Sequence, residues 1–118
     1  MLGWVLLLVL LTVQVWGLYA PSPPAAGPAG TDKLGHLLGF GLPAAVAWWL
    51  GARWWVALMV IHALVSEELQ HRISPERMLD WRDTLANLAG LALGVALAAA
   101  AARLTRHHGG MQTARKEG

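Results

Sequence analysis

Four apolar segments, separated by short polar stretches, constrain the fold of this chain more than any other feature. Each segment is roughly 16 to 19 residues long, near the lower limit for a helix that crosses a hydrocarbon core about 30 Å thick. Only 14% of the residues are charged, whereas soluble domains carry about 25%. The pattern predicts an all-α, polytopic membrane protein: a four-helix transmembrane bundle with helices at about residues 2–19, 32–50, 54–70 and 83–102.

Turn signals separate the predicted helices. Residues 21–30 read PSPPAAGPAG and predict a loop, because proline cannot donate the backbone hydrogen bond that a helix needs. Gly51-Ala52-Arg53 predicts a tight turn and an antiparallel hairpin, and Ser74-Pro75-Glu76 is typical of a helix start. Residues 1–102 are the predicted transmembrane domain, and residues 103–118 a basic, disordered cytoplasmic tail. The first segment also fits a signal peptide, but its lack of a basic start favours a retained helix.

Charge predicts an orientation in the membrane. If the helices alternate in direction, five basic residues lie on the side of Arg53 and the tail, and four lie on the other side. This excess favours a cytoplasmic position for both termini, and the basic tail is expected to touch anionic membrane lipids. Six of the seven acidic residues fall at the opposite, outer face: Asp32, Glu67, Glu68, Glu76, Asp80 and Asp83.

Helical spacing gathers polar residues from three predicted helices at this acidic face. Residues three or four positions apart share one face of a helix, and ionisable groups in a membrane usually face the bundle interior or a wet cavity. The candidate ligand site consists of Asp32, Lys33, His36, Glu67, Gln70, Arg77, Asp83 and Asn87.

Two glycine pairs predict where helices pack. Gly35-x-x-x-Gly39 and Gly90-x-x-x-Gly94 allow backbones to approach closely in a bilayer. We expect them to join helices 32–50 and 83–102, although Gly90 and Gly94 would equally serve a homo-oligomer, and the sequence leaves both open. Pro43 leaves the Gly39 carbonyl without its helical donor and predicts a kink.

An ordered set of polar and small residues lies at the ends of the predicted helices. The set is Asp32-Lys33-x-x-His36, Glu67-x-x-Gln70, Pro75-x-Arg77 and Asp83-x-x-x-Asn87-x-x-Gly90. It resembles the VanZ-like family of small bacterial membrane proteins, over residues 31–94. The resemblance implies a protein of the bacterial cytoplasmic (inner) membrane, in a family named for an accessory factor in resistance to the glycopeptide teicoplanin. The sequence departs from the family pattern in two ways. Glu68 adds a second acidic residue next to Glu67, and the spacing from Gln70 to Pro75 is longer.

Several functions fit this predicted site. The resemblance favours binding of, or action on, a cell-envelope component such as a lipid head group or a cell-wall precursor, linked to glycopeptide resistance or envelope homeostasis. Asp32, His36, Glu67 and Asp83 could hold a divalent cation or act as acid and base, which leaves catalysis open. The alternatives are a structural lock of the helix ends or, less favoured, a small transporter. No basic patch with interleaved aromatics indicates nucleic acid as a partner.

Overall fold

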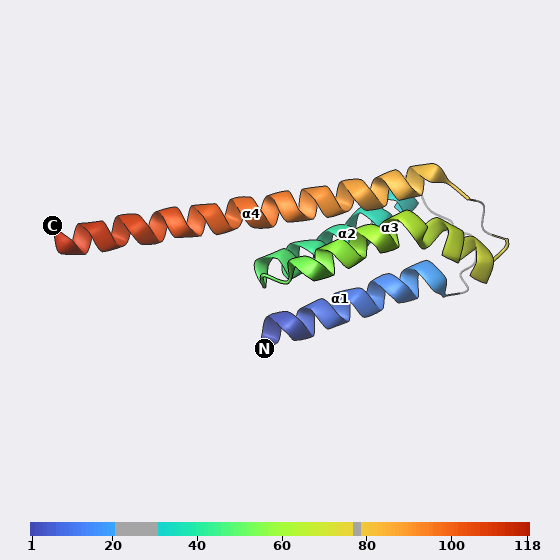
Figure 1. Ribbon diagram of the computed structural model, residues 1–118, viewed down its shortest axis with the longest axis horizontal. Helices are drawn as coiled ribbons and strands as arrows, with labels where there is room; N and C mark the ends of the chain where they lie inside the picture. The colour runs from blue at the N-terminus through green and yellow to red at the C-terminus, as the bar shows by residue number, and fades with distance from the viewer. Residues whose placement is uncertain (21–30, 77–78) are drawn as a thin grey trace.

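Four α-helices make up the fold in the computed structural model, which describes residues 1–20, 31–76 and 79–118 (Figure 1). No strand occurs within these residues, so the all-α prediction is confirmed for them. The predicted loop at residues 21–30 lies outside the described residues. The helices are α1 (Leu2–Tyr19), α2 (Thr31–Trp49), α3 (Arg53–Ile73) and α4 (Trp81–Glu117).

Successive helices run in opposite directions, so that the N-termini of α2 and α4 and the C-termini of α1 and α3 lie at one end of the molecule (Figure 1). Helix α4 lies parallel to α2 and continues well beyond the other three helices. With 37 residues, α4 is about 56 Å long at a rise of 1.5 Å per residue. This helix accounts for the elongated shape of 66 × 28 × 21 Å.

Helices α2 and α4 touch through their backbones. A Cβ atom built on Gly90 would lie 2.1 Å from the carbonyl oxygen of Leu37, and one built on Gly94 would lie 2.2 Å from that of Gly41. Real Cβ atoms do not approach so closely, so any side chain at either position would push the helices apart. The prediction that Gly90 and Gly94 lie at a helix contact therefore matches the structure.

The glycines predicted on α2 are not the ones at this contact. A Cβ atom at Gly35 or Gly39 would meet nothing within 4 Å, whereas one at Gly41 would lie 2.9 Å from the carbonyl oxygen of Gly90. Gly39 and Gly41 are separated by about 200° around a helix, so they cannot face the same neighbour. The prediction was wrong for Gly35 and Gly39, and Gly41 takes their place.

The end of α2 forms the predicted tight turn into α3. Gly51 has a φ of 76°, a left-handed conformation that glycine adopts without steric cost. The N–H of Ala52 donates to the carbonyl of Ala47 at 2.9 Å, and the N–H of Gly51 donates to that of Trp48 at 3.0 Å. This pair of bonds defines a Schellman motif, which ends α2 and reverses the chain.

Helix α4 begins two residues before the predicted residue 83, and the start signal Ser74-Pro75-Glu76 does not begin it. Ser74 is the C-cap of α3, and α4 starts at Trp81 after the N-cap Asp80, whose side chain accepts from the N–H of Arg82 at 2.9 Å. An aspartate is among the strongest N-cap residues, because its carboxylate binds N–H groups that have no helical partner. The serine and proline therefore mark the end of α3 rather than the start of α4.

Helix α1 supplies the hydrogen bond that proline removes from α2. Pro43 has no N–H to donate to the carbonyl of Gly39, and the side chain of Gln14 donates to that oxygen at 2.9 Å. Near the end of α1, the Tyr19 hydroxyl lies 2.5 Å from Nε2 of His62 on α3. These contacts make α1 part of the packed fold.

Two helices, α1 and α4, are long and apolar enough to cross a membrane, judged by length and composition over the described residues. The tail that was predicted to be disordered forms the last part of α4, with every residue from Arg103 to Gly118 exposed. Alanine, arginine, glutamine and lysine in this part are strong helix formers, whereas Gly109 and Gly110 are weak ones, so helix propensity explains only part of this continuation.

Candidate functional site

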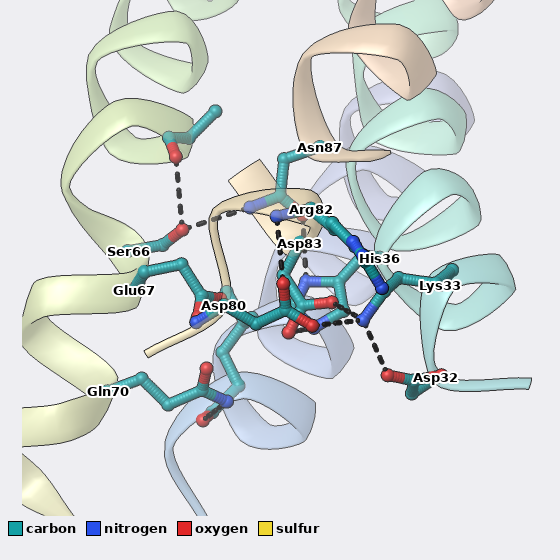
Figure 2. Close-up of polar contacts among 12 residues, drawn as sticks. Asp32, Lys33, His36, Ser66, Glu67, Gln70, Asp80, Arg82, Asp83 and Asn87 are labelled. Atoms are coloured by element: carbon teal, nitrogen blue, oxygen red, sulfur yellow. Dashed lines mark hydrogen bonds and ion pairs between the residues drawn. The ribbon is translucent and has the colours of Figure 1, made fainter. Parts of the chain in front are cut away.

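Polar side chains from three helices converge where the N-termini of α2 and α4 meet the last turns of α3 (Figure 2). The close contact at Gly90 and Gly94 holds α2 against α4 and thereby sets the distance between their polar residues. Two groups can be distinguished. The lysine cluster comprises Lys33, Asp32, Asp80 and Asp83, and the buried polar cluster comprises His36, Ser66, Glu67, Asp83 and Asn87.

The lysine cluster places one cation among three carboxylates. Lys33 Nζ lies 2.9 Å from Asp32 Oδ2 and 2.8 Å from Asp80 Oδ2, and it also donates to Asp83 Oδ1. The hydrogen bond from Lys33 and, to a smaller extent, that from the Arg82 backbone hold the pKa of Asp80 below its usual range. Because one positive charge is shared by three negative ones, the cluster retains an excess of negative charge.

A chain of hydrogen bonds crosses the buried polar cluster and fixes the orientation of its members. The hydroxyl of Ser66 donates to the carbonyl of Ala63 at 3.2 Å, and its oxygen accepts from Asn87 Nδ2 at 3.0 Å. The Asn87 amide therefore turns its oxygen, Oδ1, toward Nδ1 of His36, 2.8 Å away. Since an amide oxygen can only accept, Nδ1 of His36 carries the proton. In the neutral imidazole the lone pair then lies on Nε2.

The other ring nitrogen of His36, Nε2, faces a carboxylate. Nε2 lies 3.5 Å from Asp83 Oδ2, a separation longer than the 2.7–3.2 Å of ordinary N–H···O bonds. Both side chains are largely shielded from solvent, with 12% of His36 and 13% of Asp83 exposed.

Glu67 completes this arrangement from α3. The residue is only 7% exposed, and its Oε2 accepts from the N–H of Asp80 at 3.3 Å. Its other oxygen, Oε1, is buried and has no hydrogen-bond partner within residues 1–20, 31–76 and 79–118. His36, Glu67 and Asp83 each offer one potential metal-ligand atom, and these three atoms lie within 4.8 Å of one another. The three side chains could therefore share a cation or exchange a proton.

Of the other predicted site residues, Lys33 and Asn87 contact this triad directly, whereas Asp32 and Gln70 have partners elsewhere. Asp32 is exposed and binds Lys33. Gln70 is buried and donates from Nε2 to the carbonyl of Leu18 at 2.8 Å, which ties α3 to the end of α1. Arg77 lies outside the described residues.

Two residues of the site were not among the predicted ones. Asp80 binds Lys33, and Ser66 holds the amide of Asn87. Asp80 could have been found from its position three residues before Asp83, and Ser66 from its position four residues before Gln70. Ser66 is fully buried and donates its proton to a backbone carbonyl. Its hydroxyl is thus held as a structural group rather than as a nucleophile.

Comparison of the chain with models of known protein families, with curated proteins and with solved structures finds no match.

Proposed function

We propose that the protein is a multi-pass, VanZ-like membrane protein of the bacterial cytoplasmic membrane, in which all four helices span the bilayer. Helices α2 and α3 contain 19 and 21 residues, or about 28 and 32 Å at 1.5 Å per residue. These lengths match a hydrocarbon core of about 30 Å. Large apolar side chains are exposed on every helix, including Leu8, Leu42, Ile61 and Leu93. A lipid environment would cover this surface, which would favour aggregation in water.

The proposed function is to bind a cell-envelope component, such as a lipid head group or a cell-wall precursor, at the end of the bundle that carries the polar clusters. The observation that carries this proposal is the convergence of His36, Glu67 and Asp83 from three helices into one shielded place. An ionised group held away from water costs several kcal/mol unless it is paired. A site that binds a ligand accounts for the retention of Glu67, one of whose carboxylate oxygens is without a partner in the described part of the chain.

A structural lock is the second candidate, and the lysine cluster favours it. Lys33 joins the start of α2 to Asp80 and Asp83 at the start of α4. A lock requires these ion pairs but gives no role to Glu67 Oε1, which has no partner among the residues that the structure describes. The two candidates therefore predict different consequences for substitution of Glu67.

Complementation in cells separates the two candidates. In a bacterial strain that lacks the protein, we expect Glu67→Ala and Asp83→Ala to lose growth under envelope stress, including teicoplanin, while membrane accumulation stays unchanged. Glu68→Ala removes the neighbouring, exposed carboxylate and is the matched control, expected to behave as the native chain. Normal growth of the Glu67→Ala strain would instead support the lock.

The proposed orientation has a separate test, because the chain has no cysteine. A single cysteine at the exposed position Glu76 should react with a membrane-impermeant maleimide added to intact cells, whereas one at the exposed position Arg103 should react only after lysis. The opposite labelling pattern would place the polar end in the cytoplasm.

A further inference from the structure

We infer that His36, Glu67 and Asp83 together bind a divalent transition-metal cation, with Zn²⁺ as the expected ion. Each residue offers one ligand atom, an imidazole nitrogen or a carboxylate oxygen, and these atoms lie within 4.8 Å of one another. This inference names an ion for the binding site of the proposed function, and it depends on the proposal that the polar end of the bundle is a binding site. Three features of the buried polar cluster carry it.

The first feature is the tautomer of His36. The hydrogen bonds from Ser66 to Ala63 and from Asn87 to Ser66 leave Nδ1 as the protonated nitrogen of His36. The nitrogen that faces Asp83, Nε2, is then free to bind a metal. Metal-binding histidines usually donate their other N–H to an oxygen acceptor, which orients the ring, and the Asn87 amide oxygen occupies that position here.

The second feature is the separation between His36 and Asp83. A lone pair on Nε2 and a carboxylate oxygen repel each other when nothing lies between them, and at 3.5 Å they are too far apart for a good direct hydrogen bond. Two ligands at about 2.1 Å from one zinc ion, at the tetrahedral angle, lie roughly 3.4 Å apart. The observed separation is close to this value, so the two side chains would need little movement to share a zinc ion.

The third feature is Glu67. Its Oε1 atom is buried and unpartnered among the described residues, although a buried carboxylate normally accepts several hydrogen bonds or binds a cation. With Asp83 it brings two carboxylates to one place, and Lys33 is already shared among three aspartates. A divalent cation would supply the positive charge that the buried polar cluster lacks.

The ligand types favour a transition metal over Mg²⁺ or Ca²⁺. Mg²⁺ and Ca²⁺ are bound almost entirely by oxygen atoms, whereas imidazole suits zinc and its neighbours in the first transition row. A set of three protein ligands, one nitrogen and two oxygens, also matches the number found in zinc sites that keep a position open for another molecule.

Metal binding by the full-length protein in detergent micelles tests the inference. The protein is stripped with EDTA, incubated with Zn²⁺ or Co²⁺, dialysed, and measured by mass spectrometry for metal and by visible absorption for Co²⁺. We expect one ion per chain and a Co²⁺ spectrum typical of a nitrogen and oxygen site. His36→Gln, Glu67→Gln and Asp83→Asn should each weaken binding by more than about 100-fold, since even residues that only orient a ligand contribute about 10- to 100-fold.

Glu68→Gln is the matched control, because Glu68 is the adjacent carboxylate on the same helix but binds Arg72 on the exposed surface at 2.8 Å. It should bind zinc as the native protein does. If the native protein retains no metal after dialysis, or if Glu68→Gln loses as much metal as Glu67→Gln, the inference is wrong.

Thermal unfolding guards against variants that merely misfold. In EDTA, Glu67→Gln should unfold at the same temperature as the native protein or higher, because the change replaces a carboxylate that is buried away from water with a neutral group of the same shape. With Zn²⁺, only the native protein and Glu68→Gln should gain stability. If Glu67→Gln unfolds at a clearly lower temperature than the native protein in EDTA, the carboxylate itself stabilises the metal-free fold and the metal site is overturned.

The cellular assay and the metal assay can fail independently. If the strain that carries Asp83→Asn fails to grow under envelope stress while the native protein binds no zinc, the metal site is excluded and the proposed function stands. If zinc binds but none of the substitutions changes growth, the cation site stands and the envelope role fails.

Discussion

The contact between α2 and α4 differs from the contact between α1 and α3, and the difference shows where this small protein is tightly packed. Helices α2 and α4 meet backbone to backbone at Gly90 and Gly94. Helices α1 and α3 enclose an open, apolar groove of about 790 Å³, lined by residues such as Leu11, Leu58 and Met59. The polar clusters lie on the tight contact. The charged groups thus lie beside the helix contact that leaves no space for a larger side chain.

The largest expected effect comes from a single methyl group at the tight contact. Gly90→Ala should destabilise the protein by about 3 kcal/mol, the upper end of the usual cost of overpacking, because the added carbon meets the Leu37 carbonyl and only a backbone movement can relieve the overlap. Gly35→Ala is the matched control, since a Cβ atom there meets nothing within 4 Å. It should change stability little or raise it by about 0.5–1 kcal/mol. Reversible unfolding in detergent measures both, and equal effects would show that α2 and α4 are not held by this contact.

The next largest effect should come from the hydrogen-bond chain beside that contact. Asn87→Ala leaves Ser66 and His36 without their amide partner in a fully buried position, so we expect a loss of about 2–3 kcal/mol. Gln112→Ala removes an exposed amide from the same helix and should have no measurable effect. The nitrogen NMR signals of His36 provide a second readout. If Nδ1 stays protonated in Asn87→Ala as in the native protein, the amide does not select the tautomer.

A smaller effect is expected where α1 meets α2. Gln14→Leu removes the donor to the Gly39 carbonyl, which Pro43 leaves without a helical partner. Hydrogen bonds between helices in membrane proteins contribute about 0.6 kcal/mol on average and up to about 1.7, so we expect a loss of about 1 kcal/mol. Thr12→Val is the control, because the Thr12 hydroxyl donates within its own helix to Leu8. A loss as large for Thr12→Val would remove the special role of Gln14.

The smallest effect is predicted in the groove, although the substitution there adds the most atoms. Leu58→Phe enlarges a side chain that is 47% exposed and lines the open space between α1 and α3. Stability should change by less than about 0.5 kcal/mol, as for most substitutions on an exposed surface. A large loss measured by the same unfolding assay would mean that the groove is closed in the folded protein, and the contrast between the two contacts would disappear.

The sequence predicts the helices well because long apolar segments and turn residues are local signals. The predicted start at residue 83 is close to the observed start at Trp81, whereas Ser74-Pro75-Glu76, an acceptable start signal by composition, lies at the end of α3. The tail was mispredicted because helix-forming residues without an apolar stripe fit either a disordered segment or an exposed helix.

The candidate site was predicted in outline because residues four apart on one helix must share a face. His36, Glu67 and Asp83 lie on three such faces, and the structure brings them together. What the spacing does not give is the rotation of each helix relative to its neighbour. The faces through Asp32 and Gly39 were expected to meet α4, but the contact runs through Lys33 and Gly41, which lie further around α2.

The pairing of α2 with α4 also has a consequence for the synthesis of the protein. The chain leaves the ribosome in order, so His36 and Lys33 emerge well before Asp83 and Asn87, their partners on the last helix. The buried polar cluster can form only once α4 has been made and docked at Gly90 and Gly94. Until then the early helices carry charged groups without their later partners. A chain that ends before α4 would therefore leave Lys33 and His36 without these partners.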